Sequence, residues 1–277
     1  MDLKIIGPNE SSASGVVVDV VQPIMGMTPE EFAVLTRSML IVIPHRPSEG
    51  ICGDLAQTTG FWAIHGTPLA VLSDPFGGFV ELTRAGIVKT FLQYCHDHPN
   101  IDKLVMIDAD ENVPWDAPYR LAQWDKPVVS GVVCTSNPVR GTFACFTMKD
   151  QYGAPRFPSV NYTRKMPGRG LKQVYSVGTG LICIKKEVLE AILASGETPF
   201  IIPDSVRSQS VESGILKEGE DIAFCRQAER QGFNIYVDLS VHASHFKLLP
   251  VTWPRAAIDY DLDAADWQVN DKDFAHG

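Results

Sequence analysis

"KLVMIDADENVPWDA", residues 103–117, decides how this chain is organised. An apolar run, of the kind found in a strand buried on both faces, leads directly into Asp108, Asp110 and Glu111. Carboxylates crowded in this way repel one another and usually need a cation to compensate them. In an open α/β sheet, ligands bind beyond the carboxyl ends of the strands, which is where these side chains fall. The stretch therefore indicates either a polar turn that caps the next helix or a ligand site.

Apolar runs alternate with amphipathic segments along most of the chain. This succession predicts βαβ units and a parallel sheet, an α/β fold. The expected strands are residues 39–44, 68–73, 103–107, 127–134, 174–184 and 234–238, with a hairpin over 141–157. The expected helices are residues 52–65, 79–97, 116–125, 185–195 and 218–232, the last two ending at Gly196 and Gly232.

The two ends of the chain differ from this pattern. Residues 13–24 could form a strand. A helix should begin after Thr28, which can cap it, with Pro29 at the first helical position and Glu31 completing a capping box. The tail after residue 246 is acidic. We therefore expect an N-terminal extension (1–37), a main domain (38–246) and a C-terminal tail or lid (247–277).

Composition narrows the class of protein. The chain has 277 residues and a net charge of -9, so duplex DNA is a less attractive partner. No stretch approaches the roughly 20 apolar residues that a membrane span needs. The six cysteines are scattered and form no C-x-x-C, which favours buried thiols in a reducing cytoplasm.

Two stretches, "MIDADENVPWDA" and "GEDIAFCRQAERQGFNIYVDLSVHASH", together with the order of strands and helices, resemble the GT-A glycosyltransferases. The resemblance runs from about Met39 to His245 and is greatest to compact glycosyltransferase-like proteins of phage and bacterial genomes. It implies a GT-A fold, Rossmann-like, with a mixed and mostly parallel sheet flanked by helices. It also implies a nucleotide-sugar donor and a divalent metal, Mn²⁺ or Mg²⁺.

The resemblance assigns a metal site to Asp108, Asp110 and His245. Asp110 matches the aspartate that ligates the metal directly, and Asp108 the one near the donor ribose. His242 competes with His245, although strand alternation puts these two positions on opposite faces.

Donor-binding residues follow from the same resemblance. They are Pro44, His45, Arg46, Asp74, Arg84, Asp108, Gly178 and Gly180. Arg84 matches an arginine that faces the diphosphate in relatives, but the asparagine that often follows it is Ala85 here. The alternative for Arg84 is an ordinary charge on a helix surface.

Asp221, or else Glu220, matches the catalytic carboxylate of the family. Both residues begin an expected helix, where the helix dipole favours negative charge. Capping of that helix is therefore the alternative role.

These features predict a glycosyltransferase that uses a nucleotide-diphosphate sugar, most simply a UDP- or GDP-sugar. The acceptor could be a glycan, a lipid, a protein or a modified nucleobase. A sugar-nucleotide nucleotidyltransferase is the first alternative, although "IPHRPSEGICGD" lacks the glycine-rich loop of those enzymes. A noncatalytic module that binds a nucleotide or a sugar is the second.

Overall fold

The computed structural model describes residues 5–6, 26–45, 51–73, 79–137, 141–144, 146–149, 155–156, 170–206, 208 and 219–245. Two compact units are distinguished, residues 1–246 and 247–277. All the described residues belong to the first unit. The possible strand over 13–24 and the acidic tail lie outside the described residues.

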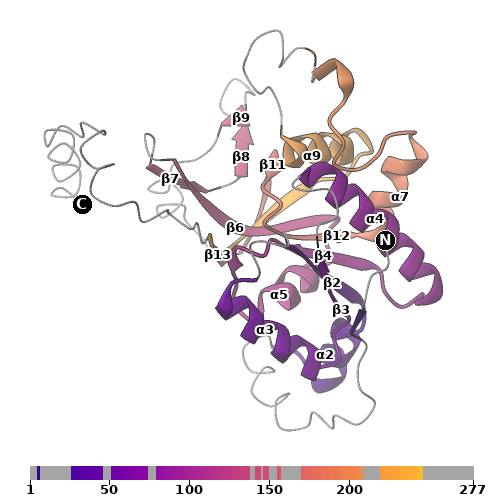
Figure 1. The fold of residues 1–277 in the computed structure, drawn as a ribbon, viewed down its shortest axis with the longest axis vertical. Coiled ribbons are helices and arrows are strands. Elements are labelled where there is room, and N and C mark those ends of the chain that lie inside the picture. Colours follow the sequence, from indigo (N-terminus) through magenta and orange to yellow (C-terminus); the bar gives the residue numbers. More distant parts are fainter. Residues whose placement is uncertain are drawn as a thin grey trace, which may run out of the picture. The chain divides into compact units, whose positions relative to one another are not determined.

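One large sheet forms the centre of the first unit (Figure 1). Its main path has the order β1-β3-β2-β4-β12-β6-β13-β10, while β5 pairs with β13 and β7 with β6. The strands of this sheet are β1 (Ile5–Ile6), β2 (Met39–His45), β3 (Leu69–Ser73), β4 (Lys103–Ile107), β5 (Glu111–Asn112), β6 (Val128–Asn137), β7 (Gly141–Ala144), β10 (Leu171–Val174), β12 (Leu181–Lys185) and β13 (Ile235–His245).

The direction of the strands confirms the predicted fold class, an α/β fold with a mixed, mostly parallel sheet. Strands β3, β2 and β4 are parallel to one another, and β6 is parallel to β13. Strand β12 lies between β4 and β6 and is antiparallel to both. Five strands therefore point their carboxyl ends at one edge of the sheet, while β12 begins at that edge.

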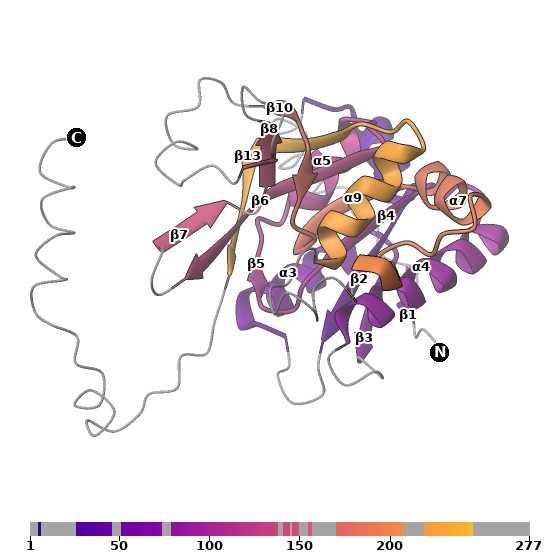
Figure 2. The ribbon, with the colours of Figure 1, turned by 90° about the horizontal axis from the view of Figure 1, so that it is seen from above.

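Helices cover both faces of this sheet (Figures 1 and 2). The helices are α2 (Pro29–Thr36), α3 (Gly53–Ile64), α4 (Val80–Asp97), α5 (Ala117–Gln123), α7 (Lys186–Ala194) and α9 (Glu220–Arg230). Helices α4, α7 and α9 pack their apolar side chains against one face, and α2, α3 and α5 against the other. This arrangement explains why the central strands read as unbroken apolar runs: both of their faces are buried.

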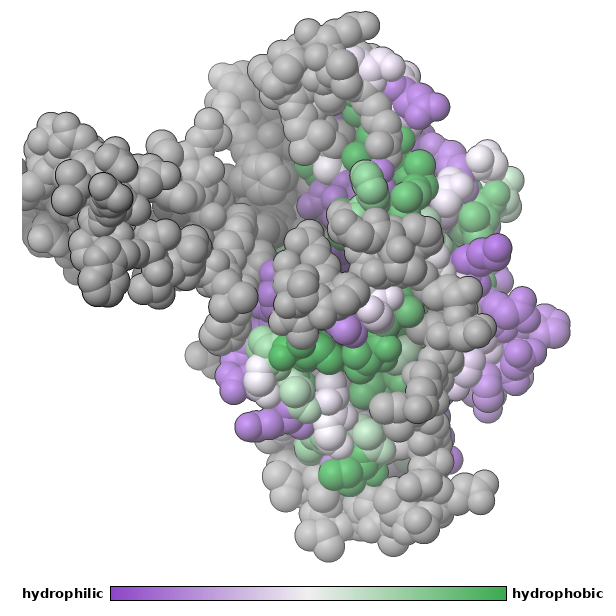
Figure 3. Space-filling view, in the orientation of Figure 1, coloured by the Kyte–Doolittle hydropathy of each residue, from purple (hydrophilic) through white to green (hydrophobic). Residues whose placement is uncertain are grey.

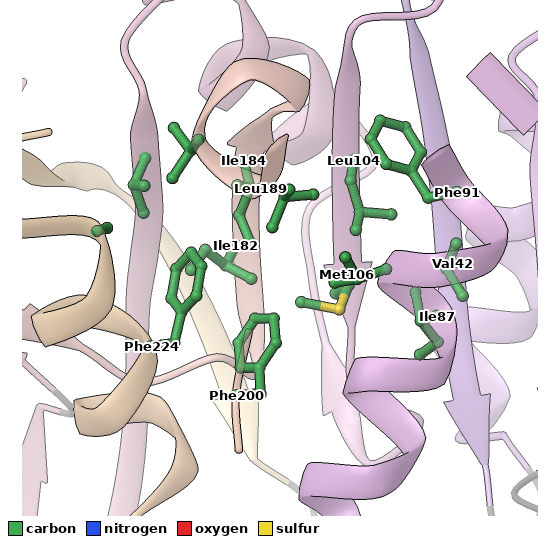
Figure 4. Close-up of a cluster of buried hydrophobic side chains, with 14 of the residues drawn as sticks. Val42, Ile87, Phe91, Leu104, Met106, Ile182, Ile184, Leu189, Phe200 and Phe224 are labelled. Carbon is green, nitrogen blue, oxygen red and sulfur yellow. The ribbon is translucent and has the colours of Figure 1, made fainter. Parts of the chain in front are cut away.

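The core beneath α4, α7 and α9 is shown in Figure 4. Phe91 and Ile87 of α4 lie over Leu104 and Met106 of β4 in this cluster. On the neighbouring side, Phe200 and Phe224 stack with ring centroids 4.4 Å apart. Figure 3 shows hydrophilic residues gathered over the outer end of α4, where Gln93, His96 and Asp97 are exposed.

The N-terminal segment contributes to the core on the face of the sheet that α2, α3 and α5 cover. The capping box at α2 is present, because Thr28 and Glu31 exchange side-chain and backbone hydrogen bonds. Phe32 of α2 is 2% exposed and packs edge-on against Tyr119 of α5, with ring centroids 5.0 Å apart. Strand β1 pairs antiparallel with β3 and stands at the end of the sheet order.

The expected local signals of the C-terminal half also appear. Strands β8 (Phe146–Lys149) and β9 (Pro155–Arg156) pair antiparallel, as the predicted hairpin requires, and β8 also pairs with β11 (Ser176–Val177). Gly196 and Gly232 have φ angles of +85° and +84°, a conformation that favours glycine after a helix. Both helices therefore end where the sequence predicts.

Candidate active site

The acidic loop follows β4 at the carboxyl edge of the sheet. The backbone N–H of Asp108 donates to the carbonyl of Gly180, 2.9 Å away, and that of Glu111 donates to the carbonyl of Asp108, 3.0 Å away. The reversed strand β12 thus holds the loop from the side. Asp108 is 31% exposed at its side chain, and Asp110 is exposed. Both carboxylates remain open to solvent at the edge where ligands bind in such sheets.

Backbone pairing brings His245 to this loop. Strand β5 is antiparallel to the end of β13, so that Glu111 lies opposite His245 and Asn112 opposite Ser244. Directly paired residues of antiparallel strands have Cβ atoms about 4.5–5.5 Å apart. The three positions of the predicted metal site therefore share one corner of the fold, although the side chain of His245 lies outside the described residues.

The competing histidine, His242, is exposed on β13. Its neighbours Val241 and Ala243 are buried, so the strand alternates at this point as expected. Position 242 pairs with Val132 of β6, away from the β5 pairing. The register thus associates position 245, and not position 242, with the acidic loop.

Arg84 of α4 lies at the centre of the site. Its side chain is 3% exposed, so the arginine is not the surface charge that was the alternative for this position. Nη2 donates to both carboxylate oxygens of Asp108, at 3.0 and 3.1 Å, and Nη1 donates to the carbonyl of Thr179 at 3.3 Å. Nε lies 3.5 Å from Oε1 of Glu220. One side chain therefore joins α4, the acidic loop, the turn before β12 and the start of α9.

The charge state of Arg84 follows from these contacts. Burial by itself lowers the pKa of Arg84, but the carboxylates of Asp108 and Glu220 raise it by more. The guanidinium is therefore cationic. Among the described residues, one cation faces three carboxylates here, Asp108, Glu220 and Asp221. Negative charge is in excess in this cluster.

Glu220 and Asp221 begin α9. The N-cap is Gly219, which supplies no side-chain cap, and Oδ1 of Asp221 accepts a hydrogen bond from the N–H of Ile222 at 2.7 Å. A Cβ on Gly219 would lie 2.7 Å from that same oxygen, so glycine leaves room for the carboxylate. Asp221 therefore makes a local backbone contact of a capping kind, and Glu220 instead reaches Arg84.

Burial raises the pKa of Glu220, with the charge of Asp221 adding to it and Arg84 opposing it. Burial likewise raises the pKa of Asp221, and the N–H of Ile222 and Arg84 oppose that shift. Carboxylates with raised pKa values at the carboxyl edge of such a sheet are candidates for proton transfer.

The glycines before β12 have distinct surroundings. A Cβ on Gly180 would lie 3.0 Å from Oε1 of Glu111 and 3.3 Å from Cγ1 of Val133. Gly178 offers its carbonyl to the hydroxyl of Ser130 at 3.3 Å. Gly180 thus allows Glu111, only 1% exposed, to pack beneath the acidic loop.

Two of the other predicted donor residues lie at the same edge. Pro44 and His45 end β2, half-buried, and pair with Leu72 and Ser73 of the parallel strand β3. Arg46 and Asp74 lie outside the described residues. The predicted positions that the structure describes therefore all occur where strands end at the carboxyl edge or where α4, α9 and β12 begin.

The donor set suits a hard divalent cation. Two carboxylates and one imidazole position offer the oxygen and nitrogen ligands that Mn²⁺ accepts, and Mg²⁺ prefers the oxygens. Within the described residues, no group of three or more His, Cys, Asp or Glu side chains is arranged to hold a metal. A complete site would require the side chain of His245 in addition to Asp108 and Asp110. The residue types fit, and the metal assignment stays a prediction.

An open groove of about 780 Å³ lies away from this site. It is lined by α2 and by Asp102 and Lys103 at the start of β4, whereas Asp108 follows the other end of that strand. This groove therefore gives no evidence of a ligand pocket at the acidic loop.

In the described part of the chain, no helix has the length and apolar character to cross a membrane.

Sequence reasoning missed two features of the site. Glu111 was treated only as part of a charge cluster, although it is buried and paired with His245 through the backbone. The ion pair between Arg84 and Glu220 was also missed, because nothing local in the sequence joins α4 to α9. One signal for the first feature was present in the sequence: Glu111 is the third carboxylate in residues 103–117.

No protein-family model and no curated protein matches this chain. Among solved structures, the crystal structure of A197 from STIV is similar over 76% of this chain and 86% of that chain, with 20% identity and a TM-score of 0.46. The crystal structure of GalNAc-T7 with UDP, GalNAc and Mn²⁺ is similar over 78% of this chain, with 11% identity and a TM-score of 0.45. This chain spans 45% of the GalNAc-T7 chain. At these similarities, neither match bears on activity.

The raised pKa of Glu220 predicts a gain of stability in Glu220→Gln. As pH rises above about 4, the unfolded carboxyl loses its proton before the folded one, so the free energy of unfolding falls. The loss is complete above the folded pKa, and glutamine avoids it. Chemical unfolding should therefore show the variant to be more stable than the parent at pH 7, with a difference that shrinks towards pH 4.

Glu229→Gln is the matched control, because Glu229 is an exposed residue of the same helix. That change should stay within about 0.5 kcal/mol at either pH. A Glu220→Gln variant that is less stable than the parent at pH 7 would contradict the argument from burial.

Proposed function

We propose that this chain is a metal-dependent glycosyltransferase that moves a sugar from a nucleotide-diphosphate sugar to an acceptor hydroxyl. The observation that carries the proposal is the convergence of Asp108 and Glu220 on the buried Arg84 at the carboxyl edge of the sheet. This convergence unites the D-x-D loop with the carboxylate pair of α9, which are the two most specific pieces of the GT-A resemblance. A reducing cytoplasm is the proposed location, in keeping with the free thiols of Cys95 and Cys183.

The excess negative charge around Arg84 favours a bound cation. Asp108, Asp110 and His245 are the residues that would hold it. A divalent ion in this position supplies charge neutralisation for the leaving diphosphate. Since a carboxylate cluster without such an ion repels the diphosphate, donor binding should depend on the metal.

The remaining proposed roles belong to the chain's own residues. Pro44, His45, Arg46 and Asp74 would bind the nucleoside part of a UDP- or GDP-sugar. Gly178 and Gly180 would let the donor sugar approach the backbone closely, in addition to the room that Gly180 leaves for Glu111.

Asp221 is the proposed general base. It would accept the proton of the acceptor hydroxyl while the hydroxyl oxygen attacks the anomeric carbon and the nucleoside diphosphate departs. Its raised pKa brings it nearer to the pH of the reaction, which increases its strength as a base. Glu220 is the alternative base, although its contact with Arg84 suits a structural part better.

Four classes of acceptor offer a suitable hydroxyl: a glycan, a lipid, a protein or a modified nucleobase. The net charge of -9 disfavours duplex DNA. A nucleotidyltransferase would release pyrophosphate instead of a nucleoside diphosphate, and a noncatalytic module would release neither, so the product distinguishes the three functions.

Asp110→Asn tests the metal-dependent binding of the donor. Asn keeps the size of the side chain but weakens its coordination of a hard cation. We expect most of the Mn²⁺-dependent affinity for UDP or GDP to be lost, with an unchanged melting temperature, when binding is measured by calorimetry with and without Mn²⁺. Asp97→Asn, at an exposed position near the end of α4, should leave the affinity unchanged. Equal nucleotide affinity in Asp110→Asn and the parent would refute the D-x-D assignment.

Asp221→Asn tests the general base. The amide oxygen can still accept from the N–H of Ile222, so the start of α9 should stay intact. Turnover should fall by at least about a hundredfold while donor affinity is retained. Steady-state kinetics of Asp221→Asn and Glu220→Gln, with the anomeric configuration of the product read in the same assay, separate the two carboxylates.

Loss of turnover in Glu220→Gln alone would move the base to Glu220. Normal turnover in both variants with an inverted product would mean that the start of α9 is only a cap. A product with retained configuration would remove the need for this base.

A further inference from the structure

Arg84 has no open face with which to meet a ligand. Its side chain is 3% exposed, and Nη1 and Nη2 both donate hydrogen bonds, while the buried Nε has no hydrogen-bond partner among the described residues and makes an ion pair. Nη2 contacts Asp108, Nη1 contacts the carbonyl of Thr179, and Nε lies beside Glu220. A diphosphate could reach these nitrogens only by displacing their present partners. The contacts therefore point to a role inside the protein, different from the direct donor contact that the resemblance implies.

Arginine is suited to this role because its guanidinium is planar and offers five donors in a fixed fork. Here the fork spans two carboxylates from distant parts of the chain. A lysine would carry the same charge at a single point and could not hold both partners at one spacing. The geometry thus requires the shape of the arginine as well as its charge.

We propose that Arg84 is a positioning residue that holds Asp108 and Glu220 at one fixed spacing, so that the acidic loop and the start of α9 act as a single site. The inference rests on the proposed function, in which Asp108 belongs to the donor side and Asp221 serves the acceptor. Because Asp221 follows Glu220 on the same helical turn, fixing Glu220 also fixes Asp221. Arg84 therefore sets the distance between Asp108, on the donor side, and Asp221, which serves the acceptor.

Two variants separate charge from shape, and one serves as control. Arg84→Gln removes both the charge and the fork, whereas Arg84→Lys keeps the charge and removes the fork. Lys89→Gln removes a positive charge from an exposed position of the same helix, away from the carboxylates. All three should be made in the full chain.

The first readout needs no turnover. The side-chain carboxyl of Glu220, which is faced by Arg84, Asp221 and Asp108, is titrated by carbon-13 NMR with a chelator present. Because Arg84 lowers the pKa of Glu220, that pKa should rise further in Arg84→Gln and stay close to the parent value in Arg84→Lys and Lys89→Gln. The same pKa in Arg84→Gln and the parent would overturn the proposal.

The second readout is kinetic. In Arg84→Lys, kcat should fall by roughly tenfold to a hundredfold, since a misplacement of about 1 Å can cost a factor of that size. The KM of the donor should change little, and Lys89→Gln should behave like the parent. Parent-like kcat in Arg84→Lys would overturn the proposal, and this variant decides the matter if Arg84→Gln does not fold.

The two readouts also separate the proposal from the proposed function. A parent protein that transfers no sugar refutes the glycosyltransferase, yet the titration of Glu220 still measures the coupling to Arg84. Conversely, an active parent with parent-like kinetics in Arg84→Lys keeps the function and removes the positioning role.

Discussion

The burial of one guanidinium among carboxylates is the constraint on which the carboxyl edge of this sheet depends. A buried charge is costly unless it is paired and hydrogen-bonded. Arg84 meets this requirement with partners from three other segments, and each of them has its own place in the fold. Through these contacts, Arg84 of α4 joins the acidic loop and the start of α9 at one point. The stability of this edge and its proposed chemistry thus share one interaction.

The reversed strand β12 makes that convergence possible. Because β12 is antiparallel to β4, its first residue pairs with the last residue of β4, and the turn before it lies against the acidic loop. The carbonyl of Gly180 then accepts from Asp108, and the carbonyl of Thr179 accepts from Arg84. A fully parallel sheet would put the start of this strand at the opposite edge. The mixed topology therefore supplies backbone acceptors where charge is concentrated.

Much of this arrangement could be predicted from the sequence, because its signals are local. Apolar runs mark the central strands, and the cap at α2 needs only Thr28 and Glu31, which lie three residues apart. The place of Asp108 at a strand end follows in the same way. The burial of Arg84 could not be predicted, since it depends on a partner in α9, which is distant in sequence. Strand register likewise emerges only from the assembled sheet, and it alone sets His245 opposite Glu111.

The central claim is that the acidic edge performs sugar transfer from an activated donor. The most direct measurement incubates the protein with UDP- and GDP-sugars, with Mn²⁺ and with mixed acceptors of the four proposed classes, and identifies the nucleotide product by chromatography. The account predicts release of UDP or GDP that stops when a chelator removes the metal. Release of no nucleotide from any donor would contradict it, as would release of pyrophosphate when a nucleoside triphosphate and a sugar 1-phosphate are supplied instead.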